Sequence, residues 1–231
     1  MDNDSTRLNK YLALHLGISR READEAIEKG QVTVNGELAE LGGRVSTGDD
    51  VKHRGKLVQN STQHILLALN KPTGYVCTRK QQGDNPTVYS LLPAKYHGLK
   101  LVGRLDKDSS GIILLTNDGQ LSYQMTHPKF HKTKIYKVRL DRELEPLHQQ
   151  MINDFGVQLE DGVSKLGLSR ISDDNRRDWQ ITMSEGRNRQ IRRTFAALGY
   201  QTKKLHRTHF GQYSLDSVDL KPGEYRETSI Q

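Results

Sequence analysis

One acidic residue, Asp106, stands where a side chain could do chemistry from a fixed position. The segment around it reads Gly103-Arg104-Leu105-Asp106-Lys107-Asp108-Ser109-Ser110-Gly111, and the apolar run Ile112-Ile113-Leu114-Leu115 follows. Such a run is typical of a buried strand. A carboxylate at the edge of that strand can be held rigidly and can serve as a nucleophile. The alternative is an ordinary turn aspartate that caps backbone amides, which is how we interpret Asp108 and Asp118.

A second segment could bring an apolar contact and a positive charge to the same pocket. Residues 185–193 read Glu-Gly-Arg-Asn-Arg-Gln-Ile-Arg-Arg. Asn188 is the expected N-cap of a helix that ends at Gly199. On this helix Ile191 begins an apolar face, and Arg192 lies about 100° round from it. A charged carboxylate in a dry pocket needs a cationic partner, because an unpaired buried charge is costly.

The first fifty residues show the pattern of a small unit with two helices and a hairpin. Thr6 is the expected cap of the first helix, and Ser19 with Glu22 forms the S-x-x-E capping box of the second. Asn35-Gly36 is the strongest short signal for a hairpin turn. The expected elements are a helix from Arg7 to about Leu16, a helix that stops at Gly30, a strand at 31–34 and a second short strand.

A larger domain is expected to begin near His64. Its strand-like runs outnumber its helical ones, and short turns often join neighbouring strands. This pattern favours an α+β fold with a mixed, mainly antiparallel sheet flanked by helices over a parallel sheet. The expected strands are 65–70, 101–105, 112–116, 134–140 and 179–183, and the expected helices are 120–127, 143–153 and 189–198. We therefore divide the chain into a small domain at 1–59, a linker at 60–63 and a larger domain at 64–231.

Composition limits the class of protein. The chain has 231 residues, enough for one moderate domain and a small one. Its single cysteine, Cys77, excludes a disulfide framework within the chain, and the nine histidines lack zinc-ligand spacing with cysteines, so no metal is expected. No apolar run approaches the roughly 18 to 20 residues of a membrane span, and the first residues do not resemble a signal peptide. A cytoplasmic protein is expected.

The charge is unevenly distributed along the chain. The formal net charge is +7, yet residues 1–60 hold nine Lys and Arg against ten Asp and Glu. Between Gly186 and Arg207 there are seven Lys and Arg and no acidic residue. A local excess of this kind favours a polyanionic partner, and RNA is the first candidate. A basic enzyme without such a partner is the alternative.

Four segments together resemble the bacterial ribosomal RNA pseudouridine synthases with an N-terminal S4 domain, which isomerise a uridine already within an RNA. The resemblance runs from about Arg7 to Arg226, and each segment alone is weakly specific. The segments are Leu69-Asn70-Lys71-Pro72-Thr73-Gly74-Tyr75-Val76, the Asp106 stretch, Lys134-Ile135-Tyr136, and 185–193 running on to Leu198-Gly199-Tyr200.

For the larger domain the resemblance implies the pseudouridine synthase fold and a reaction without cofactor or metal, since no atoms enter or leave. It implies that Asp106 is the catalytic carboxylate, that Arg192 is its ion-pair partner and that Tyr136 lies over the uracil. The implied substrate-binding residues are Arg104 in the gap left by the extracted nucleotide, Ile191 against the base, Arg187 and Arg189 on the RNA, and Lys71 in the pocket floor.

The small domain resembles an S4 RNA-binding domain. The matching stretches are Arg7-Leu8-Asn9-Lys10-Tyr11, Ser19-Arg20-Arg21-Glu22-Ala23 and Val32-Thr33-Val34-Asn35-Gly36. Basic residues at two helix starts can bind phosphates together with the helix N-termini. A solvated helix face is the alternative, because acidic residues on the second helix balance the charge. The implied RNA contacts are Arg7, Lys10, Arg20 and Arg21.

The resemblance leaves the target open. Gly74-Tyr75-Val76-Cys77, Leu205-His206-Arg207 and 222–226 resemble the small-subunit enzymes and favour 16S ribosomal RNA. Residues 188–193 look more like the large-subunit enzymes, so 23S ribosomal RNA is the alternative. The implied partner is ribosomal RNA or a ribosomal subunit assembly intermediate, with no membrane, and the chain is expected to act as a monomer. A non-catalytic S4-type RNA-binding or ribosome-assembly factor is the rival from another class.

Overall fold

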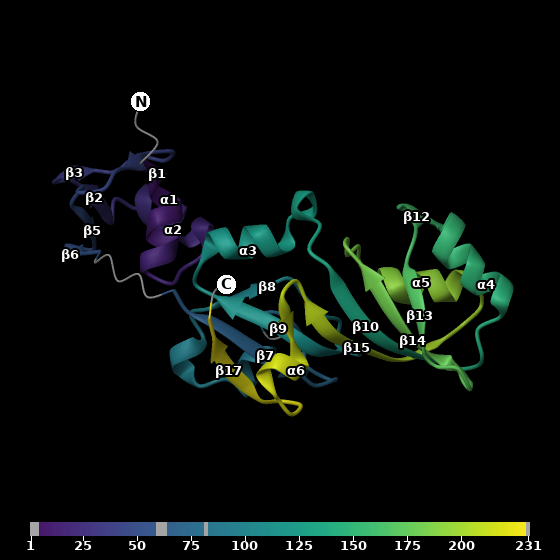
Figure 1. The fold of residues 1–231 in the computed structure, drawn as a ribbon. Helices are drawn as coiled ribbons and strands as arrows, with labels where there is room; N and C mark the ends of the chain where they lie inside the picture. Colours follow the sequence, from purple (N-terminus) through teal and green to yellow (C-terminus); the bar gives the residue numbers. More distant parts are fainter. Residues whose placement is uncertain (1–4, 59–63, 81–82, 230–231) are drawn as a thin grey trace. The chain divides into compact units, whose positions relative to one another are not determined.

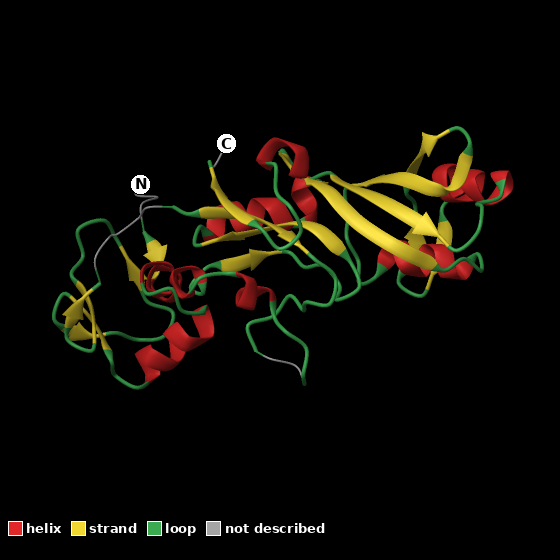
Figure 2. Ribbon diagram, turned by 90° about the horizontal axis from the view of Figure 1, so that it is seen from below, coloured by secondary structure: helices red, strands yellow, loops and turns green. Residues whose placement is uncertain are grey.

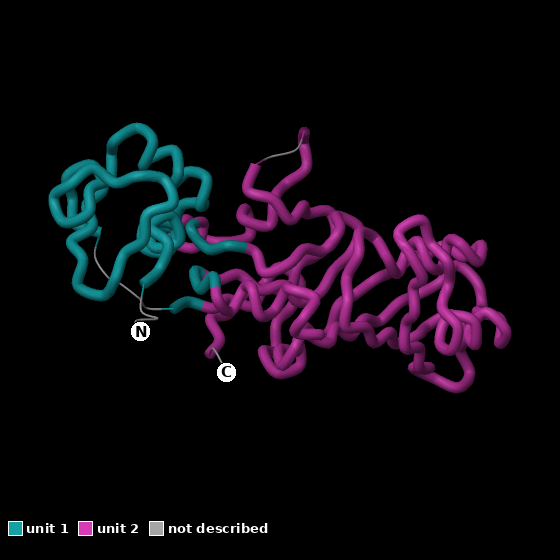
Figure 3. Tube along the Cα trace, turned by 90° about the horizontal axis from the view of Figure 1, so that it is seen from above, with its two compact units in different colours: residues 1–65, 98–100, 117–119 teal, residues 66–97, 101–116, 120–231 magenta. Residues whose placement is uncertain are grey.

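The computed structural model describes residues 5–58, 64–80 and 83–229 (Figure 1). Strands outnumber α-helices in the described chain, and several follow one another without a helix between them (Figure 2). Two compact units emerge, one from residues 1–65, 98–100 and 117–119 and one from residues 66–97, 101–116 and 120–231 (Figure 3). We call them unit 1 and unit 2. The linker expected at 60–63 lies outside the described residues, so the domain boundary stays a prediction.

Unit 1 begins with two helices whose starts differ in how they are capped. Helix α2 is Arg20–Glu28, and the capping box is confirmed because Ser19 Oγ accepts from the Glu22 amide at 3.1 Å and Glu22 Oε2 accepts from the Ser19 amide at 2.6 Å. Helix α1 is Leu8–His15. The prediction that Thr6 caps it is wrong, because Thr6 belongs to strand β1 (Thr6–Arg7), which pairs with β4 (Arg44–Val45).

A four-stranded antiparallel sheet completes unit 1, in the order β3-β2-β5-β6. Its strands are β2 (Val32–Val34), β3 (Glu37–Leu38), β5 (Val51–His53) and β6 (Lys56–Leu57). Asn35 and Gly36 join β2 to β3 with φ of 53° and 91°, which confirms the predicted turn. Apolar side chains of α1, α2, β2, β4 and β5 form the core of the unit.

Unit 2 is built, over its described residues, on a nine-stranded sheet whose main path runs β13-β14-β10-β15-β9-β7-β17. Neighbours on this path are antiparallel except β15 and β9, which are parallel. The predicted α+β class with a mainly antiparallel sheet is therefore confirmed. The strands are β7 (Leu66–Lys71), β8 (Lys100–Val102), β9 (Ser110–Thr116), β10 (Lys134–Leu140), β13 (Gly167–Ser172), β14 (Asn175–Met183), β15 (Thr202–Phe210), β16 (Tyr213–Ser214) and β17 (Tyr225–Thr228).

Two helices pack on one face of this sheet. Side chains of β7, β8, β9 and β15 form one core cluster with α3 (Gly119–Thr126) and α6 (Leu215–Val218). At the other end of the sheet, α4 (Pro146–Gln150) continues into a π-helix at Met151–Phe155, and α5 (Gln190–Ala197) lies near the hairpin of β11 (Val157–Leu159) and β12 (Gly162–Ser164) (Figure 1). Three 3₁₀ turns complete the described fold, at Val88–Leu91, Ala94–Tyr96 and Pro128–Phe130.

Gly111 allows the two parallel strands to meet directly after the Asp106 segment. It lies opposite Arg207 in the pairing of β9 with β15 and has φ of +113°. A Cβ at this position would lie 2.1 Å from the Arg207 carbonyl oxygen and 2.5 Å from its nitrogen. No side chain fits there, and the backbone conformation itself disfavours L-residues. Glycine is thus required for the close approach of β9 and β15.

We expect Gly111→Ala to lower the free energy of unfolding of unit 2 by about 3 kcal/mol or more, since it adds both a backbone clash and strain. Gly223→Ala is the matched control, because Gly223 has φ of +88° but a Cβ added there would meet no atom within 4 Å, and it should cost about 1 kcal/mol. The single tryptophan, Trp179, is fully buried on β14, so its fluorescence in urea reports on unit 2. Equal losses for both variants would contradict the close approach.

Candidate active site

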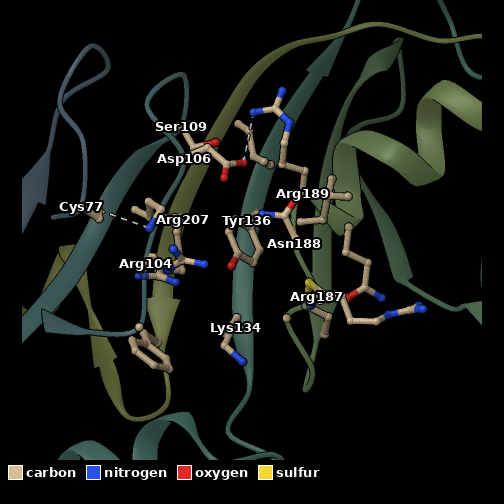
Figure 4. A pocket seen from close by; sticks show the side chains of 18 of the residues that line it. Cys77, Arg104, Asp106, Ser109, Lys134, Tyr136, Arg187, Asn188, Arg189 and Arg207 are labelled. Atoms are coloured by element: carbon tan, nitrogen blue, oxygen red, sulfur yellow. Dashed lines mark hydrogen bonds and ion pairs between the residues drawn. The ribbon is translucent and has the colours of Figure 1, made fainter. Parts of the chain in front are cut away.

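A cavity of about 490 Å³ opens in unit 2 where the segment after β8, strands β10 and β15, and the start of α5 come together (Figure 4). Most of the residues predicted for the site line it, although they come from segments far apart in the sequence. Those residues are Arg104, Asp106, Tyr136, Arg187, Arg189 and Ile191. Lys71 and Arg192, also predicted, do not line the cavity but lie behind the segment that carries Asp106.

The Asp106 side chain lies in the cavity wall, about 30% exposed, and its nearest cation is Arg189. The Arg189 Nη1 atom lies 3.6 Å from Asp106 Oδ2, and Nη2 lies 3.3 Å from Asp108 Oδ2. Arg189 occupies the N-cap position of α5 with φ of +46°. The helix therefore begins one residue later than predicted from Asn188, and Arg189 is the residue turned toward the carboxylates.

Arg192 does not form the predicted ion pair with Asp106. Its guanidinium donates instead to backbone and hydroxyl oxygens: Nη1 to the Thr202 carbonyl at 3.0 Å, and Nη2 to the Asp108 carbonyl at 3.0 Å and to Ser109 Oγ at 3.3 Å. Burial lowers the pKa of Arg192, while the nearby charges of Asp108 and Asp106 raise it. The guanidinium still stays protonated at neutral pH. Arg192 thus holds the segment of Asp106 through its backbone.

Lys71 holds the same segment from the opposite side. Its side chain is fully buried at the end of β7, and Nζ donates to the carbonyls of Ser109 at 2.6 Å and Asp106 at 3.1 Å, with Pro72 at 3.0 Å and Lys107 at 3.4 Å. Burial lowers the pKa of Lys71, while the charges of Asp106 and Asp108 raise it. Together Lys71 and Arg192 supply a donor to every carbonyl from 106 to 109, which we call the acidic loop.

The floor of the cavity places an aromatic ring between cations. Tyr136 on β10 is buried, and the guanidinium carbon of Arg207 lies 6.0 Å from its ring centroid and 4.7 Å from that of Phe210. Arg207 is 2% exposed, and its Nε donates to the Ile112 carbonyl at 2.9 Å. Lys134 lies two residues before Tyr136 on the same strand face, and burial lowers its pKa.

Sequence reasoning missed three residues of this floor, namely Lys134, Arg207 and Phe210. Strand alternation offered a signal for Lys134, because a residue two positions from Tyr136 points to the same side. No such signal marked Arg207 and Phe210, since β15 itself was not predicted. The residues around them in the sequence are charged or polar, which predicts an exposed segment and not a strand in the middle of a sheet.

Two of the predicted RNA-binding arginines, Arg104 and Arg187, differ in the hydrogen bonds and ion pairs that their side chains make. Arg104 is exposed at the cavity and makes no hydrogen bond or ion pair with the described residues. Arg187 also lines the cavity, but its guanidinium is already bonded within the fold, and its contact with RNA stays a prediction. Its guanidinium donates to the carbonyls of Asp161, Gly162 and Val163 at 2.9 to 3.1 Å and pairs with the Asp161 carboxylate at 3.0 Å. Arg187 fastens the β11–β12 hairpin to the cavity wall.

In unit 1 the four predicted RNA-contacting residues are all exposed at the starts of α1 and α2. They are Arg7, Lys10, Arg20 and Arg21. Arg20 Nη2 donates to Asn9 Oδ1 at 3.0 Å, and Asn9 Nδ2 donates to Asp24 Oδ1 at 2.8 Å. These bonds connect the two helix starts, so the basic side chains share one region of the unit.

Two further kinds of feature are absent from the described residues. None of the helices described is long and apolar enough to cross a membrane. In the same part of the chain, no three His, Cys, Asp or Glu side chains come together as metal ligands would.

We expect Lys71→Met to lower the free energy of unfolding of unit 2 by about 2 kcal/mol, because the Ser109 carbonyl and others of the acidic loop lose the ammonium as a donor. Lys165→Met is the control, since Lys165 is exposed and bonds one carbonyl, that of Asp154, and should change stability by less than about 0.5 kcal/mol. Urea unfolding followed by Trp179 fluorescence measures both. A Lys71→Met protein as stable as the parent would show that the ammonium does not hold the loop.

Comparison with known proteins places this geometry in a family. The family model for RNA pseudouridylate synthase matches residues 65–197, and the S4 domain model matches residues 6–51. Ribosomal small subunit pseudouridine synthase A of Yersinia pestis is 38% identical over 97% of this chain and 95% of its own. The dual-specificity RNA pseudouridine synthase RluF of Escherichia coli O6:H1 is 37% identical over 98% of this chain and 77% of its own.

A solved structure agrees with the sequence matches. A crystal structure of a pseudouridylate synthase superimposes with a TM-score of 0.68 at 33% identity and covers 96% of both chains. The matched family model spans the acidic loop, β10 and all of α5, which line the cavity together with β15. The chain belongs to the RNA pseudouridylate synthase family, carries an S4 domain at its N-terminal end, and is an isomerase.

Proposed function

We propose that this protein converts a uridine of 16S ribosomal RNA to pseudouridine, with Asp106 as the catalytic carboxylate. The observation that supports this most is the placement of one half-buried carboxylate in a cavity wall, with an aromatic ring and an aliphatic side chain facing the same space. Those groups are Asp106 and Tyr136 (Figure 4), with Ile191 in the same lining. A carboxylate in such a place can act as a nucleophile or stabilise positive charge on the ribose.

The reaction makes clear demands on the cavity. The bond from uracil N1 to ribose C1′ breaks, the base turns, C5 bonds to C1′, the proton on C5 leaves and N1 takes one up. The ribose passes through an electron-poor state when the first bond breaks, and a fixed anion stabilises it. The base meanwhile must be kept from leaving, which the Tyr136 ring and Ile191 accomplish by packing against it. A base within folded RNA must first leave its stack, and that costs a few kcal/mol.

Two cationic roles follow from the distances. Arg189 Nη1, 3.6 Å from Asp106 Oδ2, is the cation that pairs with the carboxylate. Lys71 and Arg192 act as positioning residues, because they bind the backbone of the acidic loop rather than the carboxylate. Arg104, exposed and without a hydrogen bond or ion pair to the described residues, is available to fill the space that the everted nucleotide leaves.

The choice of 16S ribosomal RNA rests on coverage as well as on motifs. The relative named for the small subunit matches over 95% of its own length, whereas the dual-specificity relative matches over 77%. The segments at 74–77, 205–207 and 222–226 favour the same target. A substrate in 23S ribosomal RNA is the second candidate, favoured by residues 188–193. The ribosomal RNA or an assembly intermediate that contains it is the proposed partner, and the exposed S4 residues are the proposed second contact.

We expect Asp106→Asn to abolish pseudouridine formation while RNA affinity stays within about tenfold, because phosphate contacts dominate affinity. Asp108→Asn is the matched control from the same loop and should retain most of the activity. Conversion is measured on 16S and 23S transcripts by mapping pseudouridines. Unchanged conversion by Asp106→Asn would refute the assignment of the carboxylate, and conversion of 23S transcripts alone would refute the choice of target.

Substitutions of Arg189 and Arg192 should differ in their effects on activity and on stability. Arg189→Gln removes the partner of the carboxylate from a side chain that is 43% exposed, so activity should fall at least tenfold while stability changes by less than about 0.5 kcal/mol. Arg192→Met removes a half-buried donor to three oxygens and should lower both activity and the free energy of unfolding, the latter by about 2 kcal/mol. If the Arg189 variant lost stability and the Arg192 variant did not, the two assignments would be wrong.

A further inference from the structure

Beside the cavity lies a cluster of exposed rings that the proposed reaction does not use. Tyr123 near the end of α3, His127, and Phe130 in the following 3₁₀ turn are in mutual contact. The Tyr123 and Phe130 centroids are 5.5 Å apart at 88°, with 41% and 36% of the two residues exposed. A perpendicular pair of this kind leaves ring faces uncovered. We call Tyr123, His127, Lys129 and Phe130 the ring cluster.

A cation lies on the same rings. Lys129 Nζ is 5.0 Å from the Tyr123 centroid and 4.8 Å from the Phe130 centroid. From Gly119 to Leu140 the chain has five Lys and Arg and no acidic residue. Exposed apolar rings are costly to keep in water, and an ammonium beside them would repel a basic partner. The chemistry of the ring cluster therefore fits a ligand that offers both a flat ring and a negative charge.

The ring cluster is continuous with the cavity. Thr126 and Pro128, which flank His127, line the cavity wall. Thr126 also faces the backbone next to Arg104, because a Cβ on Gly103 would lie 3.9 Å from Thr126 Cγ2. A strand of RNA whose uridine enters the cavity, and whose gap is filled by Arg104, must leave the cavity past its walls. One wall of that exit carries the ring cluster.

We propose that the ring cluster binds the RNA strand next to the target uridine, with one unpaired nucleobase stacked on Tyr123 or Phe130 and its phosphate on Lys129. The inference rests on the proposed function, since it takes RNA to be the substrate. Stacking on an aromatic side chain accepts any base, because every base has a π-face. The ring cluster thus adds affinity without sequence preference and keeps the strand open on one side of the extracted nucleotide.

The test uses the full chain with Asp106→Asn, so that RNA binds without conversion. In this background the double variant Tyr123→Leu with Phe130→Leu should raise the Kd for a ribosomal RNA transcript about tenfold or more, as expected for loss of a stacked base. Its salt dependence should stay the same, because no charge is lost. Lys129→Gln should instead lower the slope of log K against log salt by about one.

Two control variants test whether the change in Kd comes from loss of the rings in the ring cluster. Phe130→Tyr keeps a ring and should keep the Kd within about twofold of the parent. Phe155→Leu is the matched control, since Phe155 is 73% exposed on the π-helix and does not line the cavity, and its Kd should not change. With Asp106 present, the single-turnover rate at saturating RNA should be unchanged in the double variant. Only the RNA concentration that gives half of this rate should rise.

The outcomes separate this inference from the proposed function. A double variant that binds the transcript as the parent does overturns the inference, as does equal weakening by Phe155→Leu. A double variant impaired only on an assembled ribosomal particle also overturns it, because the ring cluster would then contact protein. If the parent chain forms no pseudouridine in any ribosomal RNA, the proposed function fails, and the ratio of Kd values still decides whether the rings bind RNA.

Discussion

Two cations that bind backbone rather than carboxylate are the interaction on which the cavity depends. Lys71, fully buried, and Arg192, half-buried, reach the acidic loop from opposite sides and supply donors to its carbonyls. Four carbonyl dipoles turned toward fixed positive charge leave the loop little freedom, so the Asp106 side chain is aimed by its own backbone. The arrangement separates two requirements that one ion pair would have to meet together. The position of the loop comes from Lys71 and Arg192, and the cation that pairs with the Asp106 carboxylate comes from Arg189.

The sheet explains why these donors can converge. Lys71 ends β7, the acidic loop leads into β9, and the two strands are antiparallel neighbours, so the lysine reaches the loop across one strand spacing. Arg192 arrives from α5 on the far side of β15, which β9 meets through the glycine at position 111. The parallel contact between β9 and β15 is thus the point where the two halves of the sheet join and where the cavity opens. Arg207, which is buried, lies at this contact, because it belongs to β15 and its Nε donates to the Ile112 carbonyl of β9.

Much of this could be predicted from the sequence, and the failures have identifiable causes. Local signals performed well where one residue type determines the conformation, as in the Ser19 and Glu22 box or the Asn35-Gly36 turn. Strand β10 matched its predicted range because its side chains alternate between buried and exposed. Strand β15 was missed because Lys203, Lys204 and Arg207 read as a basic surface, although this strand pairs with β10 and β9. Which arginine meets Asp106 depends on a left-handed residue at the start of α5, and sequence periodicity cannot specify that.

The same reasoning changes how the basic run from 187 to 207 is understood. The sequence indicates a local basic patch for a polyanion. In the structure, however, Arg187 and Arg193 both pair with Asp161, Arg192 binds backbone oxygens and Arg207 is buried. Charges already satisfied within the fold release few counterions when RNA binds, so they contribute less to affinity than their number indicates. Exposed cations therefore matter more, among them Lys203 and Lys204 on β15, Lys129 between its rings and the basic starts of α1 and α2. In this family member, Arg187, Arg192, Arg193 and Arg207 are used within the fold, and we propose that the exposed lysines and the basic side chains of the S4 unit attract the RNA.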